Sequence, residues 1–340
     1  MKILVIGGTR FIGLAVVRQL QAHGHQVAVF NRGQTAVDLP EGVTHIAGDK
    51  NALADSRAVL AEFAPDVVMH NIVTKEKDAQ AALDVFTGLA KRLVMVSSMD
   101  VYAPYGRLIG TETGDPLPIP FDESAPLREA WYPYRAQATD ENDFRFHYDK
   151  IPAERLVLTS KDLPGTVLRL PMVYGENDFQ HRLMPFFKPM DDGRSAIVLD
   201  EGYANWRSTY GYVENVAAAI VRACEDDRAN GKVYNIGDLT PSMLELGEMV
   251  KTLVGWQGEF VTVPTENLPE SLHTGMDTRH SLAATAERIQ HDLGYQPVID
   301  RETAMRRTIA WEREHLPPEA NFAEMYAYDT QDEVLRTIRA

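Results

Sequence analysis

Short apolar runs alternate with helical periods over the first hundred residues. Five runs rich in β-branched and other apolar residues predict buried strands, at residues 2–7, 26–31, 43–48, 66–72 and 92–98. Between them, apolar positions recur at helical spacing in residues 11–23 and 52–64. Alternating strands and helices, with uniformly apolar strands, are typical of a parallel sheet covered by helices on both faces.

The pattern loosens after residue 101. Residues 102–143 are rich in proline, glycine and acidic residues and predict a long loop over a functional site, because long ordered loops usually serve a function. Further strands are predicted at 165–171 and 232–237. Helical periods recur in four later segments, 213–226, 241–254, 281–293 and 301–314. The last three of these predict a smaller second lobe.

Composition narrows the range of partners and compartments. The formal net charge of -15 disfavours non-specific binding to nucleic acid or to anionic membranes. The one cysteine, Cys224, lies in an apolar helical pattern, so we expect a core residue and no internal disulfide. The first apolar run is too short for a signal peptide, and no run of about 18 apolar residues predicts a membrane span. We therefore expect a cytoplasmic protein.

The first predicted strand runs into the turn GGTRFIG, residues 7–13, and then into a helix. Gly7 permits a tight turn, Gly13 lets the helix pack close to the strand, and the helix N-terminus faces ligand phosphates. Glycines also end strands for structural reasons alone. Here, however, a second strand ends about 20 residues later, which is the context of a dinucleotide-binding turn.

This turn resembles the glycine fingerprint of the extended short-chain dehydrogenase/reductase superfamily, the nucleotide-sugar epimerases and dehydratases. The resemblance extends to the pair Gly48-Asp49 and to the motifs VMVSSMDVYAPYG, LRLPMVYGEND, STYGYVENVAAAI and YNIGD. It implies an α/β fold, a Rossmann-type doubly wound parallel sheet with a smaller, mostly C-terminal α/β substrate lobe. The implied division is a dinucleotide-binding domain of residues 1–168 plus 207–240, a substrate-binding lobe of 169–206 plus 241–325, and a C-terminal tail of 326–340.

The resemblance also implies which residues contact the cofactor. They are Gly7, Thr9, Arg10, Phe11, Ile12, Gly13, Asn31, Arg32, Asp49, Lys50 and Lys150. Arg10 departs from the family, which usually has glycine there, and is typical of an atypical branch that includes plastid RNA-binding relatives. Its guanidinium either donates to a cofactor phosphate or points to solvent.

The end of the second strand predicts which cofactor is bound. An NAD-selective protein places an acid there to accept from the ribose 2′-hydroxyl, whereas this chain has Asn31 and Arg32. Asparagine does not repel a 2′-phosphate and Arg32 attracts one. We therefore predict NADP in preference to NAD, with Asp49 near the adenine.

Two candidate catalytic residues follow the run at 92–98. The resemblance assigns Ser98 to polarising the substrate oxygen, and Asp100 falls where the sugar dehydratases place an acidic general base. Met99 replaces the second acid of those enzymes. The alternative that stays open is that Ser97 and Ser98 only end the strand by bonding local backbone.

Tyr148 and Lys150 have an unusual spacing. In the family a tyrosine and a lysine lie four residues apart, and four helical residues turn about 400°, which puts both side chains on one face. The shared face matters because the ammonium lowers the pKa of the tyrosine. Two residues turn about 200°, which would put Tyr148 and Lys150 on opposite faces of one helix.

Two registers are therefore weighed, and neither is intact. If Ala153-Glu154 sets the register, Lys150 matches the family lysine and Phe146 takes the tyrosine position. If Tyr148 sets the register, Pro152 takes the lysine position. However, Pro152 suits only the first turn of a helix, and Asp149 is a good N-cap, so Tyr148 would lie just outside that helix. We predict that Tyr148 turns to the site and transfers the proton, and that Lys150 binds the nicotinamide ribose. Tyr148 as a packing residue stays open.

The substrate side gives fewer signals. Asn177 and His181 follow the motif LRLPMVYGEND and are candidate substrate contacts. Arg207 lies near the place where the family grips a diphosphate, but one residue further from Val213 than usual, so diphosphate recognition is open. No metal is expected in the site. The partner is expected to be a small molecule, and a homodimer is left open.

Two interpretations of function follow. The leading one is an NAD(P)-dependent epimerase, dehydratase or reductase that acts on a sugar nucleotide or a similar hydroxyl or carbonyl substrate. The alternative is a redox-inactive cofactor-binding relative that acts as a sensor or an RNA-binding protein. The acidic composition weakens the RNA version, which needs a basic stripe.

Overall fold

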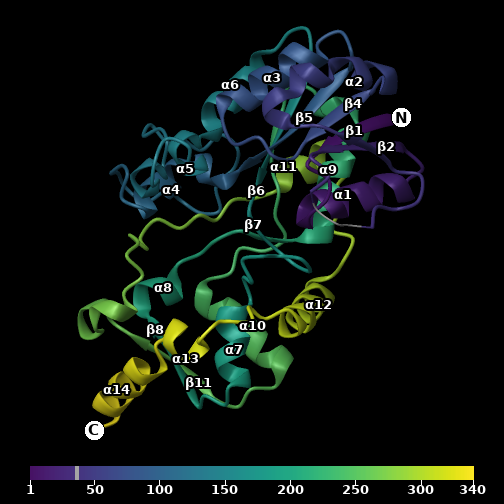
Figure 1. Cartoon of the computed structure of the whole chain (residues 1–340). Helices are drawn as coiled ribbons and strands as arrows, with labels where there is room; N and C mark the ends of the chain where they lie inside the picture. The colour runs from purple at the N-terminus through teal and green to yellow at the C-terminus, as the bar shows by residue number, and fades with distance from the viewer. Residues whose placement is uncertain (35–37) are drawn as a thin grey trace.

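The computed structural model describes residues 1–34 and 38–340, which are built around one parallel sheet of seven strands (Figure 1). The strands are β1 (Lys2–Ile6), β2 (Gln26–Asn31), β3 (Thr44–Ala47), β4 (Val67–His70), β5 (Arg92–Ser98), β6 (Gly165–Leu170) and β10 (Val233–Asn235). They lie in the order β10-β6-β5-β4-β1-β2-β3, and all neighbours are parallel. The chain thus winds outward in both directions from the sheet centre, which confirms the predicted doubly wound Rossmann-type fold.

Helices cover both faces of the sheet because its side chains alternate between two cores. Ile3 and Val5 belong to the core that α1 and α9 complete, whereas Leu4 and Ile6 belong to the core that α2, α3 and α6 complete. These helices are α1 (Phe11–Ala22), α2 (Arg57–Phe63), α3 (Glu76–Phe86), α6 (Lys150–Thr159) and α9 (Val213–Glu225). Burial on both faces requires apolar residues on both, and this is why the strands appear as continuous apolar runs in the sequence.

Two predicted helices differ in extent from the structure. The segment 52–64 divides into a 3-10 helix, η1 (Lys50–Ser56), and α2, and Asp49 caps η1 by accepting from the Asn51 amide at 2.9 Å. The segment 281–293 becomes helical only in α11 (Glu287–Leu293). In both segments the apolar residues continue at helical spacing on the N-terminal side of the residues that form the α-helix, so the predicted helices were too long at that end.

The predicted loop at residues 102–143 is anchored by one buried arginine. Its short helical turns and those beside it are η2 (Met99–Val101), α4 (Ala103–Leu108), η3 (Arg135–Gln137) and α5 (Phe144–His147). The Arg128 guanidinium donates to the carbonyl oxygens of Asp100 and Ala130, each at 2.5 Å, and lies 3.3 Å from the Asp149 carboxylate. The loop is thereby tied to the end of β5 and the start of α6, so it forms a wall beside them.

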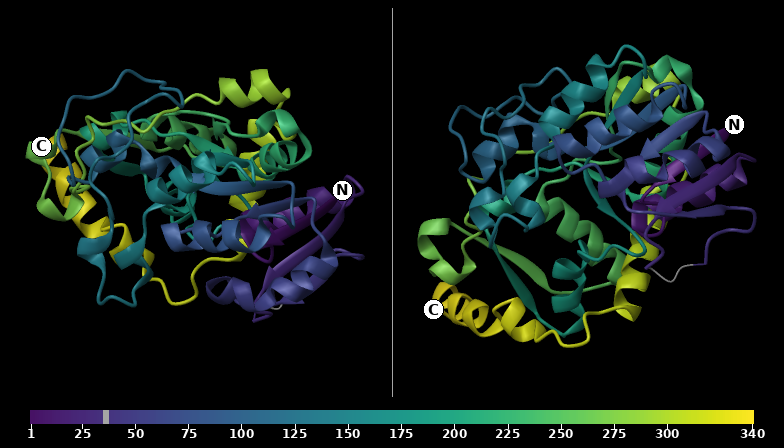
Figure 2. Two further views of the ribbon diagram at one scale, coloured as in Figure 1. Left: turned by 90° about the horizontal axis from the view of Figure 1, so that it is seen from above. Right: turned by 45° about the horizontal axis from the view of Figure 1, so that its top comes forward.

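The second lobe is built from two short parallel strand pairs and the C-terminal helices (Figures 1 and 2). The strand pairs are β7 (Met172–Tyr174) with β9 (Tyr210–Tyr212), and β8 (Ala196–Asp200) with β11 (Glu259–Val263). The helices are α7 (Met184–Asp191), α8 (Glu201–Asn205), α10 (Met243–Val254), α12 (Arg301–Glu314), α13 (Phe322–Met325) and α14 (Tyr328–Arg339), with 3-10 turns η5 (Thr265–Asn267) and η6 (Glu270–Leu272). The turn η4 (Asp227–Ala229) instead lies beside the main sheet, where Thr166 of β6 donates to the Ala229 carbonyl oxygen. Within the described parts of the chain, no helix has both the length and the apolar character needed to cross a bilayer.

The predicted C-terminal tail is a packed helix. Val334 and Leu335 of α14 share a small core with Ala196 and Val198 of β8. Figure 1 shows α14 at the far end of the second lobe from the N-terminus. Residues 326–340 are therefore better grouped with the second lobe, and the other proposed domain boundaries remain predictions.

A buried glutamate in the second lobe should make stability depend on pH. Glu312 of α12 is fully buried beside the Leu183 amide, and burial raises its pKa to about 8 from an ordinary value of 4.5. Because the folded chain holds this proton more tightly than the unfolded chain, the stabilisation is complete below pH 4.5 and is lost as the pH rises to about 8. Glu312→Gln should therefore raise the Tm relative to the parent protein at pH 8 more than at pH 5.

The matched control is Glu314→Gln, an exposed glutamate two residues further along the same helix. Thermal unfolding at both pH values measures the effect. If the Tm of Glu312→Gln differed from that of the parent by the same amount at pH 5 and at pH 8, the prediction would be wrong.

Candidate active site

The turn between β1 and α1 can be made only with glycine at two places. Gly7 has φ +89°, in the left-handed region that favours glycine. A Cβ on Gly13 would lie 2.1 Å from the Gly7 carbonyl oxygen, which is backbone and cannot move aside. The helix that starts at Phe11 has no acidic residue in its first turn, so its N-terminal amides present a positive end. The turn can therefore hold a phosphate close to the backbone.

A pocket of about 380 Å³ opens in front of this turn. It is lined by Gly7, Thr9, Arg10, Phe30, Asn31, Arg32, Gln34, Gly48, Asp49, Lys50, Asn51, Asn71 and Ile72. Seven of the predicted cofactor residues thus share one pocket, namely Gly7, Thr9, Arg10, Asn31, Arg32, Asp49 and Lys50. Phe11, Ile12 and Gly13 form the first turn of α1, and Lys150 lies outside the lining set. The pocket lies where the carboxyl ends of β1, β2 and β4 meet the glycine turn, which is the place at which Rossmann-type folds bind a dinucleotide.

The polar groups of this pocket are held in different ways. Asn31 Oδ1 accepts from the Gly33 amide at 2.7 Å and contacts His45 Nε2 at 3.0 Å, whereas the Arg32 side chain is exposed. Lys50 Nζ pairs with the Asp78 carboxylate at 2.7 Å. The exposed Arg32 at the end of β2 can therefore reach a ligand, whereas the charge of Lys50 is already compensated by Asp78.

Asn71 and Ile72 line the pocket but are absent from the predicted contacts. Asn71 Nδ2 donates to the Gly7 carbonyl oxygen at 3.2 Å, and Ile72 occupies the space that a Cβ on Gly7 would enter. Their place in the sequence could have identified them, because they directly follow β4, the strand that pairs with β1. They support the phosphate-binding turn from the neighbouring strand.

Asp100 is the centre of the predicted catalytic residues. It is 6% exposed, and its Oδ2 accepts from the Tyr148 hydroxyl at 2.8 Å and from the Tyr134 hydroxyl at 3.2 Å. Its Oδ1 is buried without a hydrogen-bond partner among the residues described. Ser98 Oγ accepts from the Asp100 amide at 3.2 Å, the local capping contact of the alternative interpretation, and its own hydrogen stays available to a ligand. The structure thus brings Ser98, Asp100 and Tyr148 together.

Tyr148 lies outside α6, as the sequence predicts. The helix begins at Lys150, and Asp149 is its N-cap, accepting from the Ile151 amide at 3.0 Å. The ring of Phe146 instead packs against the guanidinium of Arg135, whose Cζ lies 4.7 Å from the ring centre. The tyrosine therefore turns to Asp100, and Phe146 does not take its place there.

The pKa of Tyr148 is raised in this structure. Burial, followed by the charge of Asp100 and the hydrogen bond to it, raises the pKa of Tyr148 well above 10. Lys150 Nζ is 5.8 Å from the tyrosine ring centre and donates instead to the carbonyl oxygens of Val73 at 2.5 Å and Val96 at 3.3 Å. Burial lowers the pKa of Lys150. The Lys150 ammonium therefore does not lower the pKa of Tyr148 as it does in a pair spaced four residues apart, and Tyr148 donates to Asp100.

Two further tyrosines extend this hydrogen-bonded group and were missed by the sequence analysis. The Tyr134 and Tyr105 hydroxyls lie 2.7 Å apart, and the rings of Tyr134 and Tyr148 pack edge to face at 5.0 Å. Burial raises the pKa of Tyr105 and of Tyr134. Tyr134 reaches Asp100 from the long loop, where no sequence period marks which residues point inward. The loop thus supplies a second donor to the same carboxylate.

The predicted substrate contacts are not gathered at one place. Asn177, with φ +69°, lines a groove with Phe11 at the start of α1, whereas His181 stacks on Trp311 with ring centres 5.8 Å apart. Arg207 is paired with the Glu245 carboxylate, with one N–O distance of 2.9 Å, and donates to the Thr240 carbonyl oxygen. The Arg207 charge is therefore already compensated within the protein.

Comparison with known proteins gives a family match over most of the chain. The model of the NAD dependent epimerase/dehydratase family matches residues 3–237. A 2-alkyl-3-oxoalkanoate reductase of Stenotrophomonas maltophilia (strain K279a) is 31% identical over 277 residues, which cover 76% of this chain and 76% of the reductase. The chloroplast stem-loop binding protein of 41 kDa b of Arabidopsis thaliana is 24% identical over 324 residues, covering 88% of this chain and 76% of that protein.

Solved structures show the same fold. The UDP-glucose 4-epimerase of Thermotoga maritima, solved with UDP-glucose, superposes with a TM-score of 0.66 at 18% identity and covers 93% of this chain and 100% of the epimerase.

Proposed function

Because the chain belongs to the NAD dependent epimerase/dehydratase family, we propose that it is an enzyme whose proton-transfer group is Asp100, positioned by Tyr148. The observation that carries this proposal is the 2.8 Å hydrogen bond from Tyr148 to one oxygen of a buried carboxylate whose other oxygen has no partner within residues 1–34 and 38–340. The substrate is a small molecule with a hydroxyl or carbonyl group, such as a sugar nucleotide. NADP, when bound, supplies the acceptor or donor of a hydride.

We assign Asp100 the role of general base. In the oxidising direction the substrate hydroxyl gives its proton to Asp100 Oδ1, the oxygen with no partner among the residues described. Tyr148 and Tyr134 hold Oδ2 and so fix the orientation of Oδ1. Ser98 can donate its free hydrogen to the same substrate oxygen. In the reducing direction the protonated Asp100 returns the proton to the substrate oxygen.

Tyr148 is less suited to be the base than the sequence predicted. A phenol whose pKa is raised by burial and by a neighbouring carboxylate resists ionisation. Its one hydrogen is already donated to Asp100. We therefore assign it the role of a positioning residue. Lys150 contributes a buried positive charge beside β5, and its binding of the nicotinamide ribose remains a proposal.

We propose NADP in preference to NAD, on the basis of Arg32 at the rim of the pocket. Arg32→Ala should bind NADP at least about tenfold more weakly, because a hydrogen bond to a charged group contributes roughly 1.5–3 kcal/mol. The affinity for NAD, which lacks the 2′-phosphate, should stay nearly unchanged.

Calorimetric titration of both cofactors measures this, with Arg336→Ala, an exposed arginine of α14, as the control. Tighter binding of NAD than of NADP by the parent protein would contradict the preference. An unchanged NADP affinity in Arg32→Ala would contradict the role of Arg32.

The substrate class is tested by product analysis. Purified protein with NADP is incubated with a set of nucleotide-activated hexoses and with small ketones, and products are identified by mass spectrometry and NMR. Because Glu245 compensates Arg207, we expect ketones or simple hydroxyl compounds to be converted at least as well as diphosphate-linked sugars. Conversion should need the cofactor and should be lost in Asp100→Asn. If conversion were as fast without NADP, or in Asp100→Asn, as in the parent protein with NADP, the proposed function would be wrong.

Composition and family favour the enzyme over the RNA-binding alternative. The name of the Arabidopsis relative describes that protein, whereas this chain carries a net charge of -15 and would meet repulsion from a phosphate backbone.

We also propose a cytoplasmic location. Burial raises the pKa of Cys224, the one cysteine, to about 12, so the thiol is a packing residue and no reactive group. A homodimer remains a prediction that sedimentation analysis can test.

A further inference from the structure

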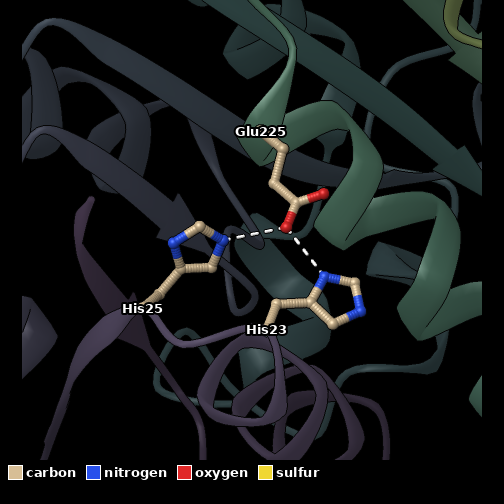
Figure 3. A group of neighbouring side chains, drawn as sticks. All are labelled: His23, His25 and Glu225. Atoms are coloured by element: carbon tan, nitrogen blue, oxygen red, sulfur yellow. Dashed lines mark hydrogen bonds and ion pairs between the residues drawn. The ribbon is translucent and has the colours of Figure 1, made fainter.

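Two histidines and a glutamate converge at the end of α1 that is remote from the cofactor pocket (Figure 3). His23 Nδ1 and His25 Nε2 each lie 2.8 Å from the same oxygen, Oε1 of Glu225. Figure 3 shows both imidazoles pointing at this carboxylate from the turn after α1, while Glu225 comes from the end of α9. Two imidazole nitrogens and one carboxylate oxygen therefore face a common point.

The backbone holds these three residues in place without any ligand. His23 and His25 are fixed by amide hydrogen bonds to the Gln19 and Leu20 carbonyl oxygens, and Gly24 between them has φ +80°. The α9 end that carries Glu225 is capped by the buried Arg92 guanidinium, which donates to the Ala223, Cys224 and Asp226 carbonyl oxygens. Because α1 and α9 also pack together in one core, the ligand atoms are preorganised by rigid elements.

The separations suit a small divalent cation. The three ligand atoms lie within 4.8 Å of one another. In a tetrahedral zinc site with bonds of about 2.0–2.1 Å the ligand atoms lie roughly 3.4 Å apart, so the two 2.8 Å contacts need to open by only about half an ångström. Each neutral imidazole can move its hydrogen to the other ring nitrogen when it binds a cation. His25 Nδ1 accepts from the Met1 ammonium at 3.3 Å, and this contact is given up when Nδ1 takes the hydrogen.

We propose that His23, His25 and Glu225 form a divalent metal site of the zinc class. Two imidazoles and one carboxylate favour Zn²⁺ over Mg²⁺ or Ca²⁺, which prefer ligand sets made only of oxygen. The fourth position is open to water, because the His23 side chain is 51% exposed. The cation joins the α1–β2 turn to the end of α9, two segments about 200 residues apart in sequence, and so stabilises the packing of α1 on α9.

This site is separate from the proposed chemistry. The phosphate-binding turn precedes α1 and the histidines follow it, so the twelve residues of the helix separate them by about 18 Å. Metal binding is therefore expected to change stability and to leave NADP affinity unchanged. The predicted absence of a metal concerned the catalytic site, and the proposal does not place one there.

Calorimetric titration of the full-length protein with Zn²⁺ tests the proposal, after treatment with chelator. We expect one equivalent to bind, a Tm that rises with Zn²⁺ concentration, and an affinity at least about tenfold weaker in both His23→Asn and Glu225→Gln. His291→Asn is the matched control, because His291 is exposed and lies 3.1 Å from a single carboxylate, that of Asp292. Unfolding measured in chelator shows whether each variant is folded.

Substitution with Co²⁺ gives a second readout, because four-coordinate Co²⁺ with nitrogen ligands has an intense visible absorption that is lost in His25→Asn. Failure to bind one equivalent of Zn²⁺ would overturn the proposal and leave a hydrogen-bonded cluster only. Equal affinity in the parent, His23→Asn and Glu225→Gln would overturn it as well.

Discussion

We expect Asp100→Asn to lose roughly 10²–10⁴ in kcat while it keeps its fold and its affinity for NADP. Asparagine has the size of aspartate and can still accept from the Tyr148 and Tyr134 hydroxyls, but it cannot take a proton from the substrate. The proposed cofactor pocket lies at the carboxyl ends of β1, β2 and β4, whereas Asp100 follows β5. The affinity for NADP should therefore be the same in Asp100→Asn and the parent, and it serves as the control. Steady-state kinetics with the substrate found by product analysis measures the change.

Tyr148→Phe separates a base from a positioning residue. It removes one of the two donors to Asp100 Oδ2 and leaves Tyr134 in place, so we expect a smaller loss of kcat than in Asp100→Asn. Tyr132→Phe is the control in the same loop, because Tyr132 contacts this region through its backbone amide, which donates to Asp149 at 2.8 Å. If Tyr148→Phe lost roughly 10²–10⁴ in kcat while Asp100→Asn kept most of its activity, the tyrosine would be the base after all.

We expect Glu154→Ala to destabilise the fold by about 3–5 kcal/mol, the largest effect on stability predicted for this chain. The Glu154 carboxylate is 1% exposed and pairs with the Arg169 guanidinium at 2.7 Å, with two further contacts at 3.2 Å. Ser97 also donates to it at 2.5 Å. Removing the carboxylate leaves the Arg169 charge buried without its partner, and this accounts for most of the cost.

The Arg169 contacts extend further into the sheet. Its guanidinium donates to the Tyr102 hydroxyl at 2.9 Å, and Tyr102 donates to Asn235 of β10 at 2.6 Å. The ion pair therefore joins α6, β5, β6 and β10 in one buried network. Chemical unfolding of the parent, Glu154→Ala and Glu302→Ala measures the difference, because Glu302 pairs with Arg306 on an exposed helix face, where an ion pair contributes less than about 1 kcal/mol. A cost for Glu154→Ala as small as that of Glu302→Ala would contradict the account.

The parts of the structure that follow from local rules were predictable from the sequence. The parallel sheet followed from apolar runs that are buried on both faces, and the tight turn between β1 and α1 followed from Gly7 and Gly13. The start of α6 followed from Asp149 as N-cap and Pro152 in the first turn, which placed Tyr148 outside the helix.

The electrostatic environment was not predictable in the same way. Lys150 is only two residues from Tyr148, yet its ammonium turns to the carbonyl oxygens of Val73 and Val96, which belong to other segments. Tyr134 reaches Asp100 across 34 residues of sequence, from a loop with no period. The direction of the Tyr148 pKa change depends on burial and on neighbours that the residue types alone do not identify.

The central claim is that a nicotinamide cofactor meets Asp100 as the proton-transfer group, and a crystal structure of the NADP complex tests it most directly. We expect the 2′-phosphate against Arg32 and the pyrophosphate over the turn at residues 7–13. We also expect the nicotinamide ring one substrate's width from Asp100 Oδ1, with Tyr148 still bonded to Oδ2. A nicotinamide ring placed away from Asp100, or a Tyr148 hydroxyl released from the carboxylate and directed at the substrate position, would contradict it.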